Sequence, residues 1–211
     1  MKKNVILLSI IMIFNYQLFA QVKNGVTNES KIVYNGQVRA ILENGETVEG
    51  QTSYSKISDD KLKVQVEGEK KVRKYKIKDV KEFTINDTLE FIKVKSTTSV
   101  KFVRPLVDRN NKLKVYALTY QSPISSGVDG NKLLFPTYRE YWVLLPGKKK
   151  AVSVKDITLS VKKVANSISD CEDLSKKVLK KENGYKLSKL YSAEKLVEVY
   201  KKISEEYEGC N

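Results

Sequence analysis

The stretch that decides the fold is Val38–Ile85, "VRAILENGETVEGQTSYSKISDDKLKVQVEGEKKVRKYKIKDVKEFTI". Apolar and polar residues alternate along it, most clearly in Lys61–Glu67 and Lys74–Lys78. An alternation with a period of two is typical of strands that bury one face of an antiparallel sheet. Asn-Gly, Asp-Asp and Glu-Gly pairs separate the alternating runs, so we expect about four or five short strands joined by tight turns.

The Asn44-Gly45 pair gives the strongest hairpin signal in the chain. In a two-residue type I′ turn both central residues have a positive φ, which Asn and Gly tolerate best. Such a turn would place Ile41 opposite Val48 on one face of the sheet. We therefore expect a β-hairpin centred on this pair.

The first residues have the three parts of a secretory signal peptide: two lysines after Met1, the apolar run Val5–Phe14, and a small residue at Ala20. We expect cleavage between Ala20 and Gln21. The alternative is an uncleaved membrane anchor, although the apolar run has about half of the roughly 20 residues that a spanning helix needs. The sequence therefore predicts a periplasmic, secreted or cell-surface protein with no transmembrane span after the signal is removed.

Changes in composition divide the chain into four segments. After the signal at 1–20 comes a polar, turn-rich lead-in at 21–35, which we expect to be flexible. Alternating patterns continue over 36–155 and predict an antiparallel β domain of about 8–10 strands. From Asp156 onward the period becomes about 3.6, which predicts helices over 156–211. The predicted fold class is α+β, a barrel or sandwich followed by a helical segment that packs on the sheet.

Further strand pairs follow the first stretch, each closed by a turn-rich segment. They are Leu89–Val94 with the strand before it, Lys101–Val107 with Leu113–Tyr120, and Tyr138–Leu145 with Ala151–Val154. The runs "LKVYALTY" and "YREYWVLL" carry large apolar groups on both faces, which is typical of strands that are covered on both sides. We expect the carboxy-terminal helices to cover the second face.

The helical region contains candidate helix starts. We expect Asp156 to begin a short helix, Asp170 to cap a second and Ser192 to cap a third, because a side-chain oxygen at a cap accepts a backbone N–H. After Ser192 an apolar stripe runs at spacings of four, three and four residues, which predicts one buried face. Its members are Leu196, Tyr200, Ile203 and Tyr207, and Cys210 extends it.

The chain has two cysteines, Cys171 at the start of one predicted helix and Cys210 at the end of another. These ends are neighbours in an antiparallel helical pair, and export to an oxidising compartment favours a disulfide between them. Closing a loop of about 40 residues stabilises a fold by roughly 4 kcal/mol in the chain-entropy model. The alternatives are a metal pair, which would have few ligands, and a redox-active pair, which would lack the Cys-x-x-Cys spacing.

Basic residues outnumber acidic ones by 39 to 25, so the net charge is +14, and near +12 once a signal with two lysines and no acid is removed. Such an excess points to nucleic acid, anionic lipid or acidic polysaccharide as a partner, or to a solvated lysine surface. Lys148, Lys149 and Lys150, beside Trp142, are the candidate anion-binding residues. The sequence lacks the arginine–aromatic clusters typical of nucleic-acid binding, so we expect no nucleic-acid partner.

Histidine is absent from the chain. Its absence excludes Ser-His-Asp and Cys-His nucleophile systems and histidine-based zinc sites, because each needs an imidazole. The sequence also lacks a glycine-rich phosphate loop, a nucleophile elbow and a calcium loop, so we predict no catalytic residue, no cofactor and no bound metal. The remaining enzymatic alternative is a hydrolase that uses the adjacent acids Asp59 and Asp60, a pair that is also typical of a turn.

The longest irregular connection is Gln121–Pro136, "QSPISSGVDGNKLLFP". Loops of this length often carry binding sites. Leu133, Leu134 and Phe135 near its end are therefore a possible ligand loop. The alternative is a hairpin tip without a ligand.

One part of the chain resembles a known fold family. The run "LENGETVEG" at 42–50, followed by "YKIKDVKEF" at 75–83, resembles the two motifs of Sm-like small barrels, with Asp79 where that family has glycine. The resemblance implies a small, strongly bent barrel. The acidic and asparagine residues with which that family contacts RNA have no counterparts here.

The layout of the mature chain, from "FAQ" at 19–21 to "VEVYKKISEEYEGC" at 197–210, resembles uncharacterised exported proteins of Gram-negative bacteria of the Bacteroidetes group. This resemblance implies export and the cysteine framework, and no activity. We therefore predict an exported, non-catalytic interaction or structural protein of the cell envelope, with an envelope protein as partner. The alternative is a binder of anionic envelope lipid or polysaccharide through its lysines.

Overall fold

The structure, a computed structural model, describes residues 33–55, 61–96, 99–121, 124–126, 132–134, 137–156 and 159–210. Its larger compact unit comprises Ile32–Gln121 and Tyr138–Asn211. The predicted signal at 1–20, its cleavage point at Ala20–Gln21, and the residues Asp59, Asp60 and Phe135 lie outside the described residues. What the sequence predicts for them stays a prediction.

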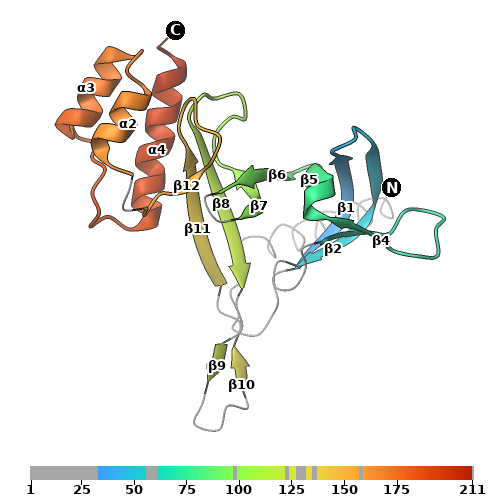
Figure 1. Cartoon of the computed structure of the whole chain (residues 1–211). Coiled ribbons are helices and arrows are strands. Elements are labelled where there is room, and N and C mark those ends of the chain that lie inside the picture. Colours follow the sequence, from blue (N-terminus) through green and yellow to red (C-terminus); the bar gives the residue numbers. More distant parts are fainter. Residues whose placement is uncertain are drawn as a thin grey trace, which may run out of the picture. The chain divides into compact units, whose positions relative to one another are not determined.

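The described part of the chain is mainly antiparallel β-sheet with three α-helices near the carboxy terminus, which confirms the predicted α+β class (Figure 1). Eight strands form the main sheet: β1 (Val33–Leu42), β2 (Thr47–Ser55), β5 (Val80–Ile85), β6 (Leu89–Lys95), β7 (Val100–Pro105), β8 (Lys114–Gln121), β11 (Thr137–Leu144) and β12 (Val152–Ser153). Their order across the sheet is β12-β11-β8-β7-β6-β5-β1-β2.

Two smaller sheets each consist of one hairpin. β3 (Lys61–Val64) pairs with β4 (Arg73–Lys76), and a short 3₁₀ helix, η1 (Ile77–Asp79), leads from β4 into β5. β9 (Ile124–Ser126) pairs with β10 (Lys132–Leu134). The prediction of an irregular connection over Gln121–Pro136 was therefore wrong in part, because this segment forms ladder hydrogen bonds of its own.

The β1–β2 hairpin forms where the Asn-Gly pair predicts it, but through a different turn. Of the two turn residues only Gly45 has a positive φ, +87°, which is the geometry of a type I turn followed by a left-handed glycine. This loop is one residue longer than the predicted type I′ turn. Ile41 consequently lies opposite Thr47, and Val48 lies opposite Ala40, so the predicted Ile41–Val48 pair is wrong by one residue.

A first core, the strand core, is formed by residues of β1, β2, β3, β5, β6 and β7, and none of its buried members is helical. Its aromatic centre is Phe83, whose ring stacks on Phe91 at 4.8 Å and meets Phe102 edge-on at 5.0 Å. Such ring contacts stabilise the core by more than the burial of their apolar area alone. The buried members are Val38, Ala40, Leu42, Val48, Tyr54, Leu62, Val64, Val80, Phe83, Ile85, Phe91 and Phe102.

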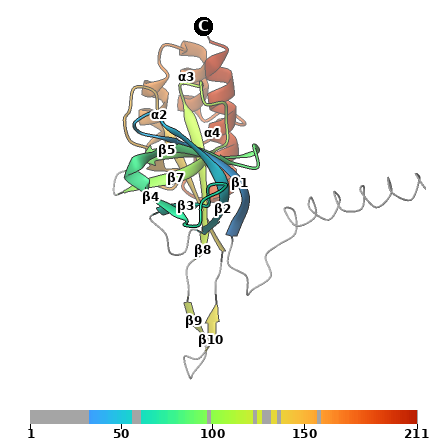
Figure 2. The ribbon, with the colours of Figure 1, turned by 90° about the vertical axis from the view of Figure 1, so that its right-hand side faces the viewer.

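A second core, the helix core, lies between the sheet and the helices α2 (Val161–Ser167), α3 (Glu172–Lys180) and α4 (Ala193–Glu208). In Figures 1 and 2 the helices lie on one side of β8 and β11, away from β1 and β2. On β11, Val143 faces this core while Trp142 belongs to a separate cluster on the other face of the strand. The prediction that helices cover the second face of these strands is confirmed.

The start of α4 is the one that the sequence predicts. Ser192 is the N-cap, and its Oγ accepts a hydrogen bond from the Lys195 backbone N–H at 3.2 Å. The predicted apolar stripe is buried in the helix core, and its members are Leu196, Tyr200, Ile203 and Tyr207.

The other two predicted caps are wrong. Ser160, not Asp156, caps α2, because its hydroxyl accepts a backbone N–H from the first turn. Cys171 is the N-cap of α3 and makes no side-chain capping bond. The carboxylate of Asp170 instead accepts a hydrogen bond from the Tyr207 hydroxyl at 2.7 Å, so it ties α3 to α4.

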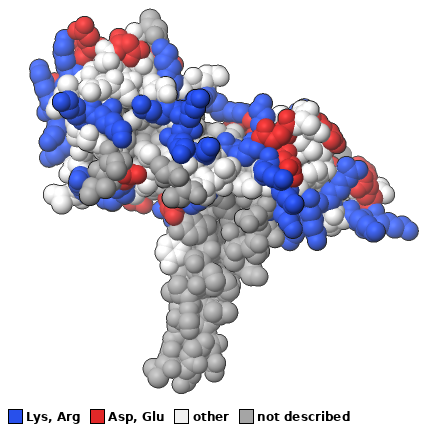
Figure 3. Space-filling view, viewed as in Figure 1, with Lys and Arg blue, Asp and Glu red and all other residues white. Residues whose placement is uncertain are grey.

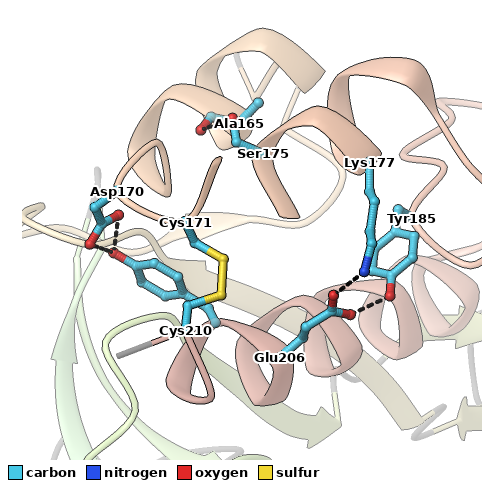
Figure 4. Close-up of a disulfide and its surroundings, with 9 residues drawn as sticks. Ala165, Asp170, Cys171, Ser175, Lys177, Tyr185, Glu206 and Cys210 are labelled. Carbon is cyan, nitrogen blue, oxygen red and sulfur yellow. Dashed lines mark hydrogen bonds and ion pairs between the residues drawn. A yellow bond between two sulfur atoms is a disulfide. The ribbon is translucent and has the colours of Figure 1, made fainter. Parts of the chain in front are cut away.

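The predicted disulfide between Cys171 and Cys210 is present, with Cα atoms 5.7 Å apart (Figure 4). It joins the start of α3 to the end of α4 and closes a loop of 39 residues. Both cysteines of the chain are thus paired.

Two isolated bridges extend the main sheet beyond its ladders. Gln51 on β2 pairs with Gln65 just after β3, which adds the β3–β4 hairpin next to β2. Ser96 at the end of β6 pairs with Ala151 just before β12, and the Ala151 N–H donates to Lys95 O at 2.9 Å. The segment that ends in Ala151 is therefore fixed to strand β6 in the middle of the sheet.

Candidate functional site: a lysine-rimmed apolar pocket

The described surface contains a pocket of about 420 Å³ between the β11–β12 connection and the start of α2. Its floor is apolar: Leu145 is buried, and Val152 and Leu159 are half-buried. Its rim consists of lysines, namely Lys148, Lys149, Lys150 and Lys163. The three lysines that the sequence analysis singled out as anion-binding candidates thus line one concave surface.

A tight turn presents these lysines. The Lys148 N–H donates to Leu145 O at 3.1 Å, and Gly147 has φ +68°. Pro146 and Gly147 therefore occupy the two central positions of a type II turn, where proline sets φ and glycine tolerates the left-handed conformation. After this turn the chain runs through the lysines to Ala151, which is fully buried.

The fourth lysine comes from a different element. Leu159 and Lys163 are four residues apart around the Ser160 cap of α2, and both line the pocket. Leu145 and Leu159 bring the sheet and the helix segment together, because both belong to or pack on the helix core. The pocket is therefore a product of the same packing that holds the helices on the sheet.

The electrostatic character of the pocket is uniform. No acidic side chain lines it, and all four lysines are exposed to solvent. Within the described residues none of the four forms an ion pair or a side-chain hydrogen bond. Four ammonium groups around an apolar floor suit a ligand that combines a negative charge with an apolar group.

A larger groove, of about 1010 Å³, lies beside Arg109 and Tyr116, but several of its charged side chains already have partners. Arg109 pairs with Glu82 and, at 2.6 Å, with Glu90. Burial raises the pKa of Tyr116 to about 12, so its hydroxyl stays protonated at neutral pH. Lys114 donates to the Arg109 carbonyl oxygen at 2.8 Å. Because acids and bases neutralise one another there, size alone does not make this groove the better ligand site.

Other residues named in the sequence analysis do not join the pocket. Trp142 is not among its lining residues, and Lys101 lies over its ring at 5.2 Å from the centroid instead. Leu133 and Leu134 belong to β10, and nothing more is described of their side chains. Within the described ranges, no group of three or more Cys, Asp or Glu side chains is placed to hold a metal ion, and no helix is long and apolar enough to cross a membrane.

Sequence reasoning missed the apolar floor and the fourth lysine of this pocket. Leu145, Val152 and Leu159 look like ordinary core positions in the sequence. Lys163 is one of many helical lysines. The available signal was the four-residue spacing of Leu159 and Lys163 around a serine cap, which places both on one side of the helix start.

Comparison with protein-family models, with curated proteins and with solved structures finds no match for this chain.

Proposed function

We propose that this protein is an exported, non-catalytic binding module of the cell envelope that holds an amphiphilic anion in the lysine-rimmed pocket. The observation that carries the proposal is the combination of four lysines and an apolar floor in one pocket without an acidic lining residue. An acidic polysaccharide would use the lysines alone. An anionic lipid or a fatty acid would also cover Leu145, Val152 and Leu159.

The signal-like first residues and the disulfide support the location outside the cytosol. A hydrophobic run after two lysines is typical of exported chains, and disulfides persist in oxidising compartments. The net charge of +14 supports an anionic partner, because a basic surface attracts anions before contact.

The test measures binding of an alkyl phosphate with a long chain by isothermal titration calorimetry, using the mature, oxidised protein. We expect the triple variant Lys148→Gln, Lys149→Gln, Lys150→Gln to bind about tenfold more weakly, since exposed charge contacts contribute a few tenths of a kcal/mol or more each. Higher salt should weaken binding to the original protein, because the Debye length is about 8 Å at physiological ionic strength.

Matched controls distinguish the effect of the pocket lysines from a general effect of positive charge. The variant Lys180→Gln, Lys186→Gln, Lys189→Gln removes the same charge from exposed positions outside the pocket and should bind as the original protein does. A neutral alkyl glycoside of equal chain length should bind much more weakly than the alkyl phosphate. Equal affinity of both triple variants, or affinity that is unchanged by salt, would contradict the proposal, as would turnover of an envelope polymer by the purified protein.

A further inference from the structure

A second basic surface, separate from the pocket, lies on the β3–β4 hairpin. Residues 61–78 contain eight lysine or arginine residues and two glutamates, so 18 residues carry +6 of the net +14 of the chain. In Figure 3, blue side chains gather where Figure 1 places β4 and the turn before it. None of these residues lines the lysine-rimmed pocket.

The register of the hairpin places lysines opposite lysines. Lys61 pairs with Lys76, and Lys63 pairs with Lys74, in the antiparallel ladder. Because residues two apart on a strand share a face, all four side chains lie on the same face of the hairpin. We call this set the lysine ladder. Its members stand about 5 Å apart across the strands and roughly 7 Å apart along them.

The opposite face of the hairpin explains why the strands form despite this repulsion. Leu62 and Val64 are almost completely buried in the strand core, and Tyr75 packs against it. Their burial fixes the register, since a shift by one residue would expose them. The packing of Leu62, Val64 and Tyr75 on the buried face therefore keeps the lysines of the two strands opposite one another on the exposed face.

Like charges directly opposite each other destabilise a strand pair. Within the described residues Lys61, Lys74 and Lys76 have no acidic partner, while the nearby Glu69 is engaged by Arg73. A structural cost retained on a solvent-exposed face is typical of a binding surface. The rival explanation is that lysines on the edge strand β4 prevent pairing with another chain. That explanation accounts for Lys74 and Lys76. It does not account for Lys61, because β3 is not an edge strand: β4 pairs with it on one side, and the Gln51–Gln65 bridge joins it to β2 on the other.

We propose that the lysine ladder binds a linear acidic polysaccharide, which is a chain that repeats carboxylate or phosphate groups along its length. The ammonium groups of Lys61, Lys74 and Lys76 are spaced along one strand and across to the next, and this spacing is complementary to such a repeat. Within the described strands β3 and β4, the ladder face has no aromatic side chain on which a base could stack, because Tyr75 belongs to the opposite face. Single-stranded nucleic acid therefore fits less well. Among the described residues of the hairpin, Val72 is the one large apolar side chain that is exposed, and a single valine gives little apolar area to insert into a bilayer, so a membrane surface fits less well.

The test measures binding of the mature protein to a linear polyuronate such as alginate, with neutral dextran as the uncharged reference. We expect Lys74→Gln with Lys76→Gln to weaken alginate binding about five- to tenfold and to reduce its salt dependence. Lys74→Arg with Lys76→Arg keeps the charge and should retain binding. The control Lys180→Gln with Lys189→Gln removes equal charge from exposed positions elsewhere and should change affinity by less than about twofold.

Three outcomes would overturn the proposal. The glutamine pair could leave alginate binding unchanged while self-association rises, which would assign the lysines to edge protection. The protein could bind anionic phospholipid vesicles or oligothymidylate more tightly than alginate through the same lysines, which would assign another partner. Finally, the variant Lys74→Gln with Lys76→Gln and the control variant Lys180→Gln with Lys189→Gln could bind alginate equally well. The triple variant at Lys148–Lys150 should keep alginate binding, so failure of the pocket proposal and failure of this one remain distinguishable.

Discussion

Glu206 is one carboxylate that holds three segments together at the scale of single residues. It lies on α4 and accepts hydrogen bonds from Lys177 on α3 and from the Tyr185 hydroxyl in the connection between the helices (Figure 4). The bonds from Lys177 and Tyr185 hold the pKa of Glu206 below its ordinary value of 4.5. Its interactions therefore stabilise the charged form, and with it the folded state.

Because folding lowers the pKa of Glu206, the stability that this residue contributes depends on pH. A carboxyl whose pKa is lowered by folding contributes stability above its unfolded-state pKa, and the contribution is lost as the pH falls through its folded-state pKa. We expect Glu206→Gln to lower the free energy of unfolding by about 1 kcal/mol near neutral pH. The difference between the two proteins should shrink as the pH drops below about 4.

Urea denaturation at several pH values measures this effect. Glu205→Gln is the matched control, because Glu205 is the exposed neighbour of Glu206 on the same helix. If Glu206→Gln has the same stability as the original protein at neutral pH, or if the difference grows in acid, the account of this carboxylate is wrong.

At the scale of elements, the disulfide and the Asp170–Tyr207 hydrogen bond fasten the same two helices. Cys171 and Asp170 lie at the start of α3, and Cys210 and Tyr207 lie at the end of α4 (Figure 4). Burial, and next to it the hydrogen bond to Asp170, raises the pKa of Tyr207 to about 12, so this donor persists well above neutral pH. Loss of the disulfide therefore leaves one polar contact at the same place.

We expect Cys171→Ser with Cys210→Ser to lower the free energy of unfolding by up to about 4 kcal/mol, because the unfolded chain regains the freedom of a loop of 39 residues. Denaturation of the oxidised protein, the reduced protein and the double variant measures it. The reduced protein and the variant should agree with each other. A variant as stable as the oxidised protein would show that the remaining contacts suffice.

The elements that the sequence predicts correctly are those that depend on near neighbours. The Ser192 cap needs only the first turn of α4. The predicted pairing of Leu89–Val94 with the strand before it needs only a tight turn, in which Asn86 and Asp87 tolerate a positive φ. The length of the β1–β2 loop was missed because Asn-Gly suits more than one turn type, and sequence alone does not select between them.

Features that join distant segments could not be predicted from the sequence. Asn111 donates to the buried Ser204 hydroxyl at 2.9 Å, and that hydroxyl donates to Leu113 O, across more than 90 residues of chain. Likewise, Asp170 lies at a cap-like position but bonds to Tyr207 because α4 packs beside it. The fourth pocket lysine, Lys163, has the same origin. Each depends on tertiary packing, which the local pattern does not encode.

At the scale of the larger unit, the strand core and the helix core share no residue, and a smaller cluster of Val103, Tyr116, Leu118, Trp142 and Ala151 is separate from both. The strand core contains residues of β1, β2, β3, β5, β6 and β7, and the helix core contains residues of the helices and of β8 and β11. Separate cores joined by a continuous hydrogen-bonded sheet can open in separate steps.

We expect a cavity in one core to loosen that core first. Ile168→Ala, in the helix core, should accelerate amide hydrogen exchange in α2, α3 and α4, and Val64→Ala should do so in β1, β2 and β5. Exchange followed by mass spectrometry resolves the two regions. Equal acceleration throughout the described unit by either variant would mean that it opens as a single cooperative body.

The bond between Ala151 and Lys95 has a consequence for recognition. It anchors the end of the lysine-bearing turn, while the Lys148–Leu145 hydrogen bond closes its beginning. The backbone beneath the ammonium groups is therefore preorganised, and an anion that docked in the proposed pocket would have only side-chain rotamers to immobilise. The loop loses its conformational entropy when the chain folds and not when a ligand binds. More of the electrostatic attraction would therefore appear as affinity.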